Sequence, residues 1–158
     1  MDPARFVTDA SLDLLARRLR FLGYDVVTHR GARLEELFES AARSGRTVLT
    51  LSDRHPARWA HVPVARVPRG DAAAAVRAIA AAHAPAGPPF SRCALCNTAL
   101  VPRSSFEARG EVPGRVIRAG WPLTYCPGCG HWYWPGSHVA RLRDWLEAAL
   151  GRALPEPP

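Results

Sequence analysis

The sequence predicts an α/β domain, in which helices flank a mainly parallel sheet, followed by a small metal-binding ribbon and a C-terminal helix. First, short β-branched runs alternate with segments of helical periodicity over residues 1–84. Second, the remainder of the chain holds two Cys-x-x-Cys turns with 29 residues between them. Third, a proline-rich segment at residues 85–90 lies between these parts, and we interpret it as a stiff linker.

Two units of strand and helix open the chain. Residues 5–8 form a short apolar run before Asp9, and apolar residues then recur at helical spacing from residue 12 until Gly23, which predicts a strand followed by a helix. Residues 25–29 predict a second strand, and residues 34–44 predict a second helix. Gly45 follows this helix, as expected for a C-terminal cap in the left-handed conformation.

The next units complete the predicted sheet. Residues 47–51 are an uninterrupted run rich in β-branched side chains, as expected for a strand that is covered on both faces. Residues 62–67 predict a fourth strand, toward an edge of the sheet because Pro63 lacks a backbone donor. Asp71 is the expected N-cap of an alanine-rich helix that extends to residue 84.

The part after the linker, residues 91–158, is predicted to contain the ribbon and the last helix. Residues 104–121 are polar, contain several glycines and arginines, and predict a long hairpin or loop between the two cysteine turns. Apolar residues at helical spacing predict a helix over residues 138–150, with Ser137 as its N-cap. Residues 155–158 are expected to be disordered.

The cysteines of the chain are Cys93, Cys96, Cys126 and Cys129. Each Cys-x-x-Cys turn presents two thiolates to one tetrahedral ion, and two such turns complete the ligand shell of a structural zinc site. The alternatives are two disulfides or a thioredoxin-type redox pair. Disulfides suit a secreted chain, for which we see no signal sequence, and a redox pair needs no second turn. We therefore predict a zinc ribbon whose fold depends on its ion.

The charge of the chain permits a nucleic-acid partner. The net charge is +7, and all 21 basic residues are arginine, which can pair bidentately with phosphate and stack on bases. A lysine-free composition rich in Ala, Arg, Pro and Gly is also what a GC-rich coding sequence gives, so charge alone leaves both explanations open. No run approaches the roughly 20 apolar residues of a membrane span. We expect a cytoplasmic protein with no membrane contact.

Four acidic residues are predicted to lie at one edge of the sheet. Asp9 follows the first strand, Glu35 and Glu36 begin the helix after the second strand, and Asp53 follows the third strand. Ligands collect at the carboxyl ends of parallel strands, and gathered carboxylates favour a divalent cation such as Mg²⁺ or Mn²⁺ that activates water at a phosphodiester. The alternative is that Asp9 or Asp53 caps the next helix and that the glutamates are first-turn acids favoured by the helix dipole.

Several motifs of the chain resemble the PIN-like RNase family that is named for the C-terminal region of the Mut-seven exonuclease. In the first part these motifs are Phe6-Val7-Thr8-Asp9, the run from Leu15 to Asp25, Glu36-Leu37 and Leu49-Thr50. In the second part they are Cys93-Ala94-Leu95-Cys96-Asn97, Tyr125-Cys126-Pro127-Gly128-Cys129-Gly130, the run from Tyr133 to His138, and Arg141. The resemblance implies a PIN-like α/β domain with a zinc ribbon and a metal-dependent ribonuclease activity.

The acidic positions depart from the family pattern in two places. The family usually has an aspartate at the start of the second helix, where this chain has Arg33-Leu34 before Glu35 and Glu36. After the third strand the family usually reads Thr-Arg-Asp, whereas Asp53 here lies one residue further on. One residue displaces a carboxylate by about 3.5 Å, which is larger than a magnesium–oxygen distance of about 2.1 Å. The predicted acidic site is therefore partly degenerate.

Four further residues are candidates for contact with RNA. Arg17 and Arg20 lie one turn apart and could hold phosphate, or else pair with Asp13 and Asp25. His138 and Arg141 could contact RNA or line a domain interface, and the aromatic run from Trp132 to Trp134 could stack on bases or pack beside the metal. We expect an RNA-binding, metal-dependent ribonuclease. The alternative is a non-catalytic module that binds RNA or a ribonucleoprotein.

Overall fold

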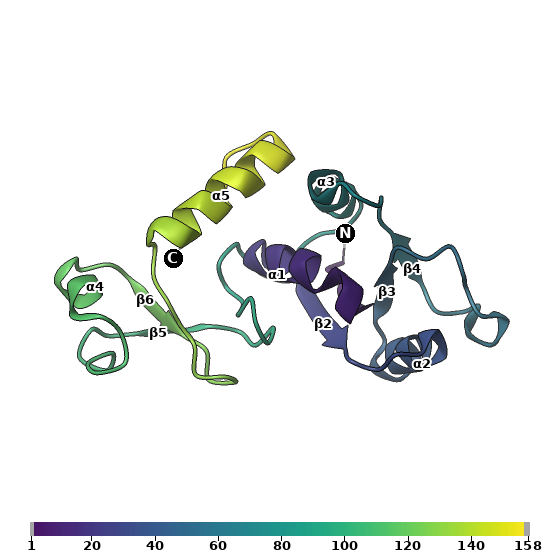
Figure 1. Cartoon of the computed structure of the whole chain (residues 1–158), viewed down its shortest axis with the longest axis horizontal. Helices are drawn as coiled ribbons and strands as arrows, with labels where there is room; N and C mark the ends of the chain where they lie inside the picture. Colours follow the sequence, from purple (N-terminus) through teal and green to yellow (C-terminus); the bar gives the residue numbers. More distant parts are fainter. Residues whose placement is uncertain (1, 157–158) are drawn as a thin grey trace.

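The computed structural model describes residues 2–156, and a four-stranded parallel sheet forms the centre of its α/β part (Figure 1). The elements of this part are β1 (Arg5–Asp9), α1 (Asp13–Phe21), β2 (Asp25–His29), α2 (Leu34–Ser44), β3 (Thr47–Thr50), β4 (Val64–Arg66) and α3 (Ala72–Ala82). The strand order is β2-β1-β3-β4, with each neighbouring pair parallel. The predicted α/β class with a mainly parallel sheet is therefore confirmed, and β4 is an edge strand as Pro63 indicated.

The sheet separates two hydrophobic clusters, because neighbouring residues of a strand point to opposite faces. Phe6 of β1 and Leu49 of β3 belong to the larger cluster, with the buried faces of α1 and α3. Val7 and Val48 belong to the other cluster, with α2 and Val62. Both faces of the sheet are thus covered, which explains why its central strands read as continuous apolar runs.

The ribbon, residues 91–136, is a smaller antiparallel unit at the left of Figure 1. It contains β5 (Val101–Arg103), α4 (Gly114–Arg118), β6 (Leu123–Tyr125) and β7 (Trp132–Tyr133), and its strand order is β5-β6-β7. β5 and β6 pair as a hairpin, as expected, but their connection includes the helix α4, which the sequence did not predict. Val116 of α4 is buried against Leu123 and anchors this short helix.

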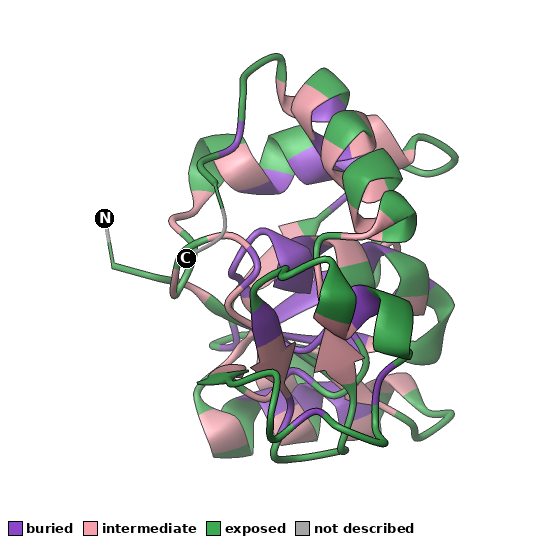
Figure 2. Cartoon of the chain, turned by 90° about the vertical axis from the view of Figure 1, so that its left-hand side faces the viewer, coloured by how far each residue is buried: buried purple, intermediate pink, exposed green. Residues whose placement is uncertain are grey.

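The last helix, α5 (Ser137–Leu150), leaves the ribbon and packs on α3 of the α/β part. Its Leu146 is fully buried in the larger hydrophobic cluster, which also includes Phe90 of the linker and Ala94 of the ribbon. Figure 2 shows buried positions on the inner sides of the helices and exposed positions on their outer sides. The linker thus joins two parts that share one core. The division of the chain into two domains at residues 85–90 stays a prediction.

Helix ends follow the predicted signals except at α5. Gly45 adopts the left-handed conformation after α2, and the Asp71 side chain accepts a hydrogen bond from the Ala74 amide at the start of α3. Ser137 is the first residue of α5, so Gly136 holds the N-cap position and the predicted serine cap is wrong by one residue. Of the tail predicted to be disordered, residues 155–158, residues 157–158 lie outside the described part of the chain, whereas Arg143 contacts Pro155 O and the Glu156 carboxylate, both at 3.3 Å.

The linker is fixed to the turn between α1 and β2. The Ala86 and Gly87 amides donate to Gly23 O at 3.0 and 3.1 Å, and the Phe90 amide donates to Phe21 O at 2.7 Å. Gly23 has a φ of +90°, and a Cβ there would overlap Gly87 O and lie 2.7 Å from Pro88 O. Glycine is therefore required at this turn by both its conformation and its neighbours.

Candidate metal centre and nucleic-acid interface

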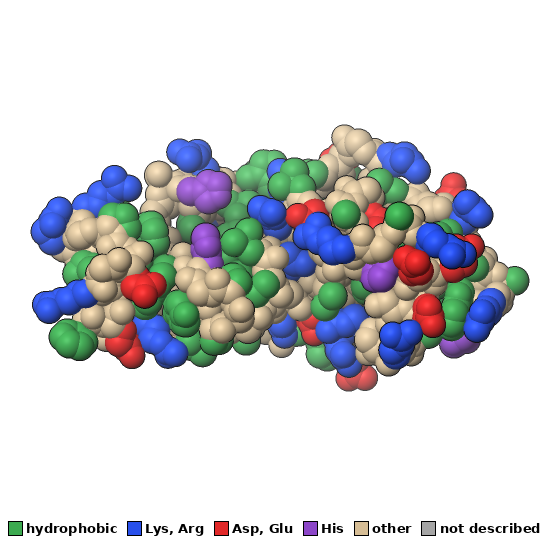
Figure 3. All heavy atoms as spheres, turned by 60° about the horizontal axis from the view of Figure 1, so that its bottom comes forward, with side chains coloured by type: hydrophobic (Ala, Val, Ile, Leu, Met, Phe, Trp, Pro, Cys, Tyr) green, Lys and Arg blue, Asp and Glu red, His purple; other side chains and the backbone are tan. Residues whose placement is uncertain are grey.

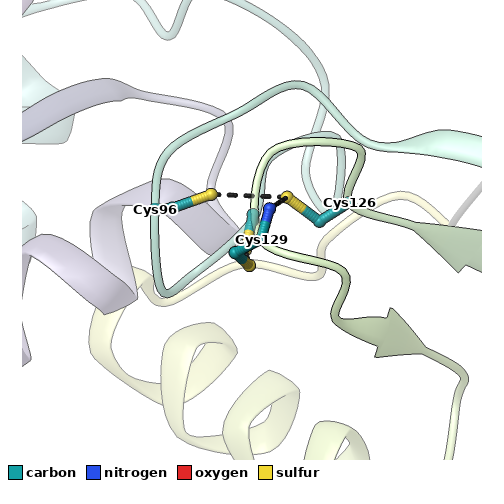
Figure 4. Close-up of side chains that lie close together, drawn as sticks. Cys96, Cys126 and Cys129 are labelled. Atoms are coloured by element: carbon teal, nitrogen blue, oxygen red, sulfur yellow. Dashed lines mark hydrogen bonds between the residues drawn. The ribbon is translucent and has the colours of Figure 1, made fainter.

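The four cysteine sulfurs lie within 4.8 Å of one another (Figure 4 shows three of the side chains). The Sγ atoms of Cys93 and Cys129 are 3.6 Å apart, and those of Cys96 and Cys126 are 3.3 Å apart. These distances exceed a disulfide bond of about 2.05 Å, and all four cysteines are free. A tetrahedral zinc ion with Zn–S bonds of about 2.3 Å needs sulfurs about 3.8 Å apart, so the four residues fit this ion.

The thiols of this cluster affect one another's protonation. Burial would raise the pKa of Cys96, but hydrogen bonding with Thr98 outweighs it and lowers the pKa to about 6. Burial raises the pKa of Cys129 to about 12, with further increases from the neighbouring thiols. Burial likewise raises the pKa of Cys126. Four thiolates at these distances repel one another, and a divalent cation would remove that repulsion.

Tyr133 supports the first cysteine turn from the opposite strand of the ribbon. Its hydroxyl oxygen lies 3.1 Å from Cys93 Sγ and accepts a hydrogen bond from the Ala94 amide at 3.2 Å. Burial and the neighbouring thiol raise the pKa of Tyr133, which keeps the hydroxyl protonated. Tyr133, the central residue of the aromatic run from Trp132 to Trp134, therefore packs beside the cysteine cluster. Such packing is one of the two roles considered for this run.

Arg20 connects α1, β2 and the first cysteine turn. Its side chain is buried with 2% exposure. Its Nε donates to Val26 O at 2.8 Å, and its Nη1 donates to Ala94 O at 2.7 Å. Its Nη2 donates to Thr28 Oγ1 at 3.0 Å, and burial lowers the pKa of Arg20 below its ordinary value. All three guanidinium nitrogens thus donate to partners inside the protein, which corrects the expectation that Arg20 holds a phosphate.

Asn97 connects the same turn to the edge strand β2. Its Oδ1 accepts from the Val26 amide at 3.0 Å, and its Nδ2 donates to Asp25 Oδ1 at 2.7 Å. Arg46 Nη1 donates to the same Asp25 oxygen at 2.7 Å. Burial alone would raise the pKa of Asp25, but the hydrogen bonds from Arg46 and Asn97 lower it overall. Asn97 thereby satisfies a backbone donor that an edge strand would otherwise leave open.

The four predicted acids lie around the carboxyl edge of the sheet but do not converge. Within residues 2–156, the four cysteines are the only group of three or more His, Cys, Asp or Glu side chains whose ligand atoms gather within 4.8 Å. Asp9 Oδ1 accepts from the Ser11 amide at 2.8 Å and from the Ser11 hydroxyl, so Asp9 caps a 3₁₀ turn at residues 10–12. As they stand, these carboxylates do not fit one Mg²⁺ or Mn²⁺ ion, whose ligands lie at about 2.1 Å.

His29 is a residue at this edge that the sequence analysis missed. It is the register partner of Asp9 at the ends of β2 and β1. Its Nε2 is buried without a hydrogen-bond partner among the described residues and lies 3.9 Å from Glu36 Oε2. His29 could have been identified from the sequence, because it lies at the end of a predicted strand, as Asp9 does. Glu35 and Glu36 also line a depression of about 360 Å³ with Arg33, Arg58 and Trp59.

Three of the predicted RNA contacts lie together in a groove between α1, the ribbon and α5. We define the ribbon groove as this cavity of about 710 Å³, which Arg17, His138 and Arg141 all line. Trp132 and Trp134 line it too, although Trp132 also packs on Tyr125 with ring centroids 4.9 Å apart. The groove therefore brings three predicted side chains into one place. Asp53, which follows β3, is exposed and does not line this groove.

The fold and these sites define a class of protein, an α/β domain with a parallel sheet joined to a four-cysteine ribbon. No helix in the part of the chain that the structure describes has the length and apolar character needed to cross a membrane. The family model described as the Mut7-C RNAse domain matches residues 4–146. The chain therefore belongs to the Mut7-C RNAse domain family. No curated protein and no solved structure matches it.

Proposed function

We propose that this protein binds RNA and cleaves it at the carboxyl edge of the sheet. The observation that carries the proposal is the family membership, which covers residues 4–146. The family is described as an RNase domain, and Asp9, Glu35, Glu36 and Asp53 all follow strands at the edge where such folds collect ligands. The chain is a metal-dependent hydrolase in this proposal, with Mg²⁺ or Mn²⁺ as the ion of the acidic edge and RNA or a ribonucleoprotein as its partner.

The carboxylates of this edge must move before they can share an ion. Asp9 would have to leave its hydrogen bonds with Ser11, and Glu36 would have to turn from its position near His29. We therefore assign no catalytic step to an individual carboxylate. His29 has a ring nitrogen without a partner among the described residues and is an additional candidate ligand or proton acceptor of the same edge.

The ribbon contributes a structural zinc ion in this proposal. Cys93, Cys96, Cys126 and Cys129 would hold it, which fits the closed four-sulfur shell of a structural site. When bound, zinc supplies no open position for chemistry and stabilises the two turns. We expect the protein to act in a reducing compartment such as the cytoplasm, because free thiolates are needed for this site.

The test of cleavage uses a labelled mixed RNA pool with Mn²⁺. We expect the wild-type protein to cleave it and Asp9→Asn to bind it without cleavage, because asparagine keeps a cap acceptor but loses the charge. Ser11→Ala is the matched control, since it removes the hydroxyl that contacts Asp9 and leaves the carboxylate. Equal cleavage by wild type and Asp9→Asn would contradict the assignment of this edge.

A second candidate function is RNA binding without catalysis. The observation that favours it is the separation of the four carboxylates, together with the displaced position of Asp53. The same experiment decides between the candidates. Salt-dependent binding of the RNA pool, with no cleavage by the wild type in Mn²⁺, would support the non-catalytic module.

A further inference from the structure

The ribbon groove combines walls from three separate parts of the chain. Leu14, Arg17 and Arg18 come from α1, and Ala94 and Leu95 come from the first cysteine turn. The third part, residues 115–145, contributes side chains from α4, β7 and α5. The groove exists because Arg20 and Asn97 fix the first cysteine turn to the α/β part, which sets the distance between α1 and the ribbon.

Basic side chains line this groove and carboxylates do not. Its charged or ionisable lining residues are Arg17, Arg18, Arg115, Arg141, His131 and His138. The chain has 14 acidic residues, and none of them lines the groove. Over the α/β part, at the right of Figure 3, arginine and acidic side chains are by contrast mixed. A cavity lined by one sign of charge concentrates ligands of the opposite sign.

The arginines that line the groove differ in whether their guanidinium groups already have a partner within the protein. Within residues 2–156, no carboxylate lies within 4.0 Å of the guanidinium of Arg115 or Arg141, and both residues are exposed. Arg17 lies 3.3 Å from Asp13, but this exposed pair is weak and can exchange for a phosphate. Arg18 is stacked on Trp145 at 3.9 Å from the ring centroid, so it forms part of the wall.

Apolar and aromatic surface lies between these charges. Leu14 is 63% exposed and Leu95 is 41% exposed, and both line the groove. The rings of Trp132 and Trp134 are half-buried in its lining. Arginines that meet phosphates, placed beside aromatic rings that stack on bases, are the combination that binds single strands. A duplex keeps its bases stacked inside, so it could use the arginines of this groove but not its apolar surface.

We propose that the ribbon groove is a binding site for single-stranded RNA, in which Arg17, Arg115 and Arg141 contact phosphates and Trp132 or Trp134 stacks on a base. This inference rests on the proposed RNA binding, and it specifies which class of RNA binds and where on the protein it binds. The groove is lined by α1, the ribbon and α5, and none of the four acids proposed for cleavage lines it.

The test measures binding of a labelled unstructured RNA, and of the same sequence as a duplex, at several salt concentrations. The wild type is compared with Arg115→Ala/Arg141→Ala. The matched control is Arg118→Ala/Arg152→Ala, which removes the same charge from exposed residues outside the groove, one of them on α4 as well. We expect the groove variant to bind the single strand at least about tenfold more weakly, with a salt slope smaller by roughly 1.4 because two phosphate contacts are lost.

The outcomes separate this inference from the proposed function. If wild type binds the single strand and the two double variants lose affinity equally, the groove assignment is overturned while RNA binding stands. Wild-type binding of the duplex as tightly as the single strand would overturn the class of RNA. Failure of the wild type to bind either RNA at low salt would overturn the proposed function itself.

Discussion

The Arg20 guanidinium donates a hydrogen bond to the Ala94 carbonyl oxygen at 2.7 Å, across 74 positions of sequence. This contact joins the first helix to the first cysteine turn, and the same side chain also bonds Val26 and Thr28 of β2. Arg20 is buried, and Ala94 belongs to the hydrophobic cluster that the two parts share. The position of the ribbon relative to the sheet therefore depends on a buried cation with no freedom to contact a ligand.

Replacing Arg20 by methionine is expected to destabilise the protein by about 3 kcal/mol, because buried carbonyl groups lose a charged donor. The control is Arg17→Met on the same helix, whose side chain is 47% exposed and should change stability by less than about 0.5 kcal/mol. Urea unfolding of both zinc-loaded variants measures the difference. Similar stability of the two variants would show that the Arg20 contacts contribute little.

Substitution of Asn97 tests the connection to the edge strand. Asn97 has a φ of +72°, and its side chain bonds Val26 and Asp25. We expect Asn97→Gly to cost about 2 kcal/mol from the lost hydrogen bonds, and Asn97→Ala to cost about 1 kcal/mol more because alanine disfavours this conformation. Thermal unfolding measures the order. Equal effects of Gly and Ala would argue against a conformational role for this residue.

Asp25 should give the folded protein a stability that depends on acid pH. Its pKa is lowered in the folded state relative to an unfolded carboxyl value of about 3.9. The stabilisation is therefore present above about pH 4 and is lost as the pH falls through the lower folded value. We expect wild type to exceed Asp25→Asn in stability at pH 6 and this difference to shrink below pH 3. A difference independent of pH would contradict the role of the charge.

Removal of zinc is expected to affect the whole chain and not the ribbon alone. Because the first cysteine turn contacts Arg20 of α1 through Ala94 and Val26 of β2 through Asn97, its loss removes partners from both elements. We expect chelation, or Cys126→Ser, to lower the free energy of unfolding by about 5 kcal/mol or more. Native mass spectrometry should find one zinc ion per wild-type chain. An unchanged unfolding temperature after complete zinc removal would contradict this coupling.

Local patterns in the sequence were enough to predict the sheet, its helices and the cluster of four cysteines. Strands such as β3 and helices such as α2 follow from side-chain periodicity, and the cysteine spacing defines the cluster. The helix α4 was missed because only Val116 is buried in its five residues. Short helices of this kind depend on tertiary contacts, which the local sequence does not display.

The site residues were harder to predict because their geometry depends on partners far away in the chain. Arg20 looked available for phosphate, but it lies one turn after Ala16 on the buried face of α1, and its partners are 6 to 75 residues distant. Asp9 bonds its neighbour Ser11, a contact that the spacing of the two residues permits and that competes with metal binding. The clustering of Arg17, His138 and Arg141 came from the packing of α5, which no local pattern specifies.

The most direct measurement is ultraviolet cross-linking of a single-stranded RNA to the wild-type protein, followed by peptide mass spectrometry. The account predicts adducts on Trp132, Trp134 or His138, which line the ribbon groove. Phe106 and Trp121, which are 73% and 41% exposed elsewhere on the ribbon, serve as internal controls. Adducts confined to Phe106 and Trp121, with none in residues 131–141, would contradict it.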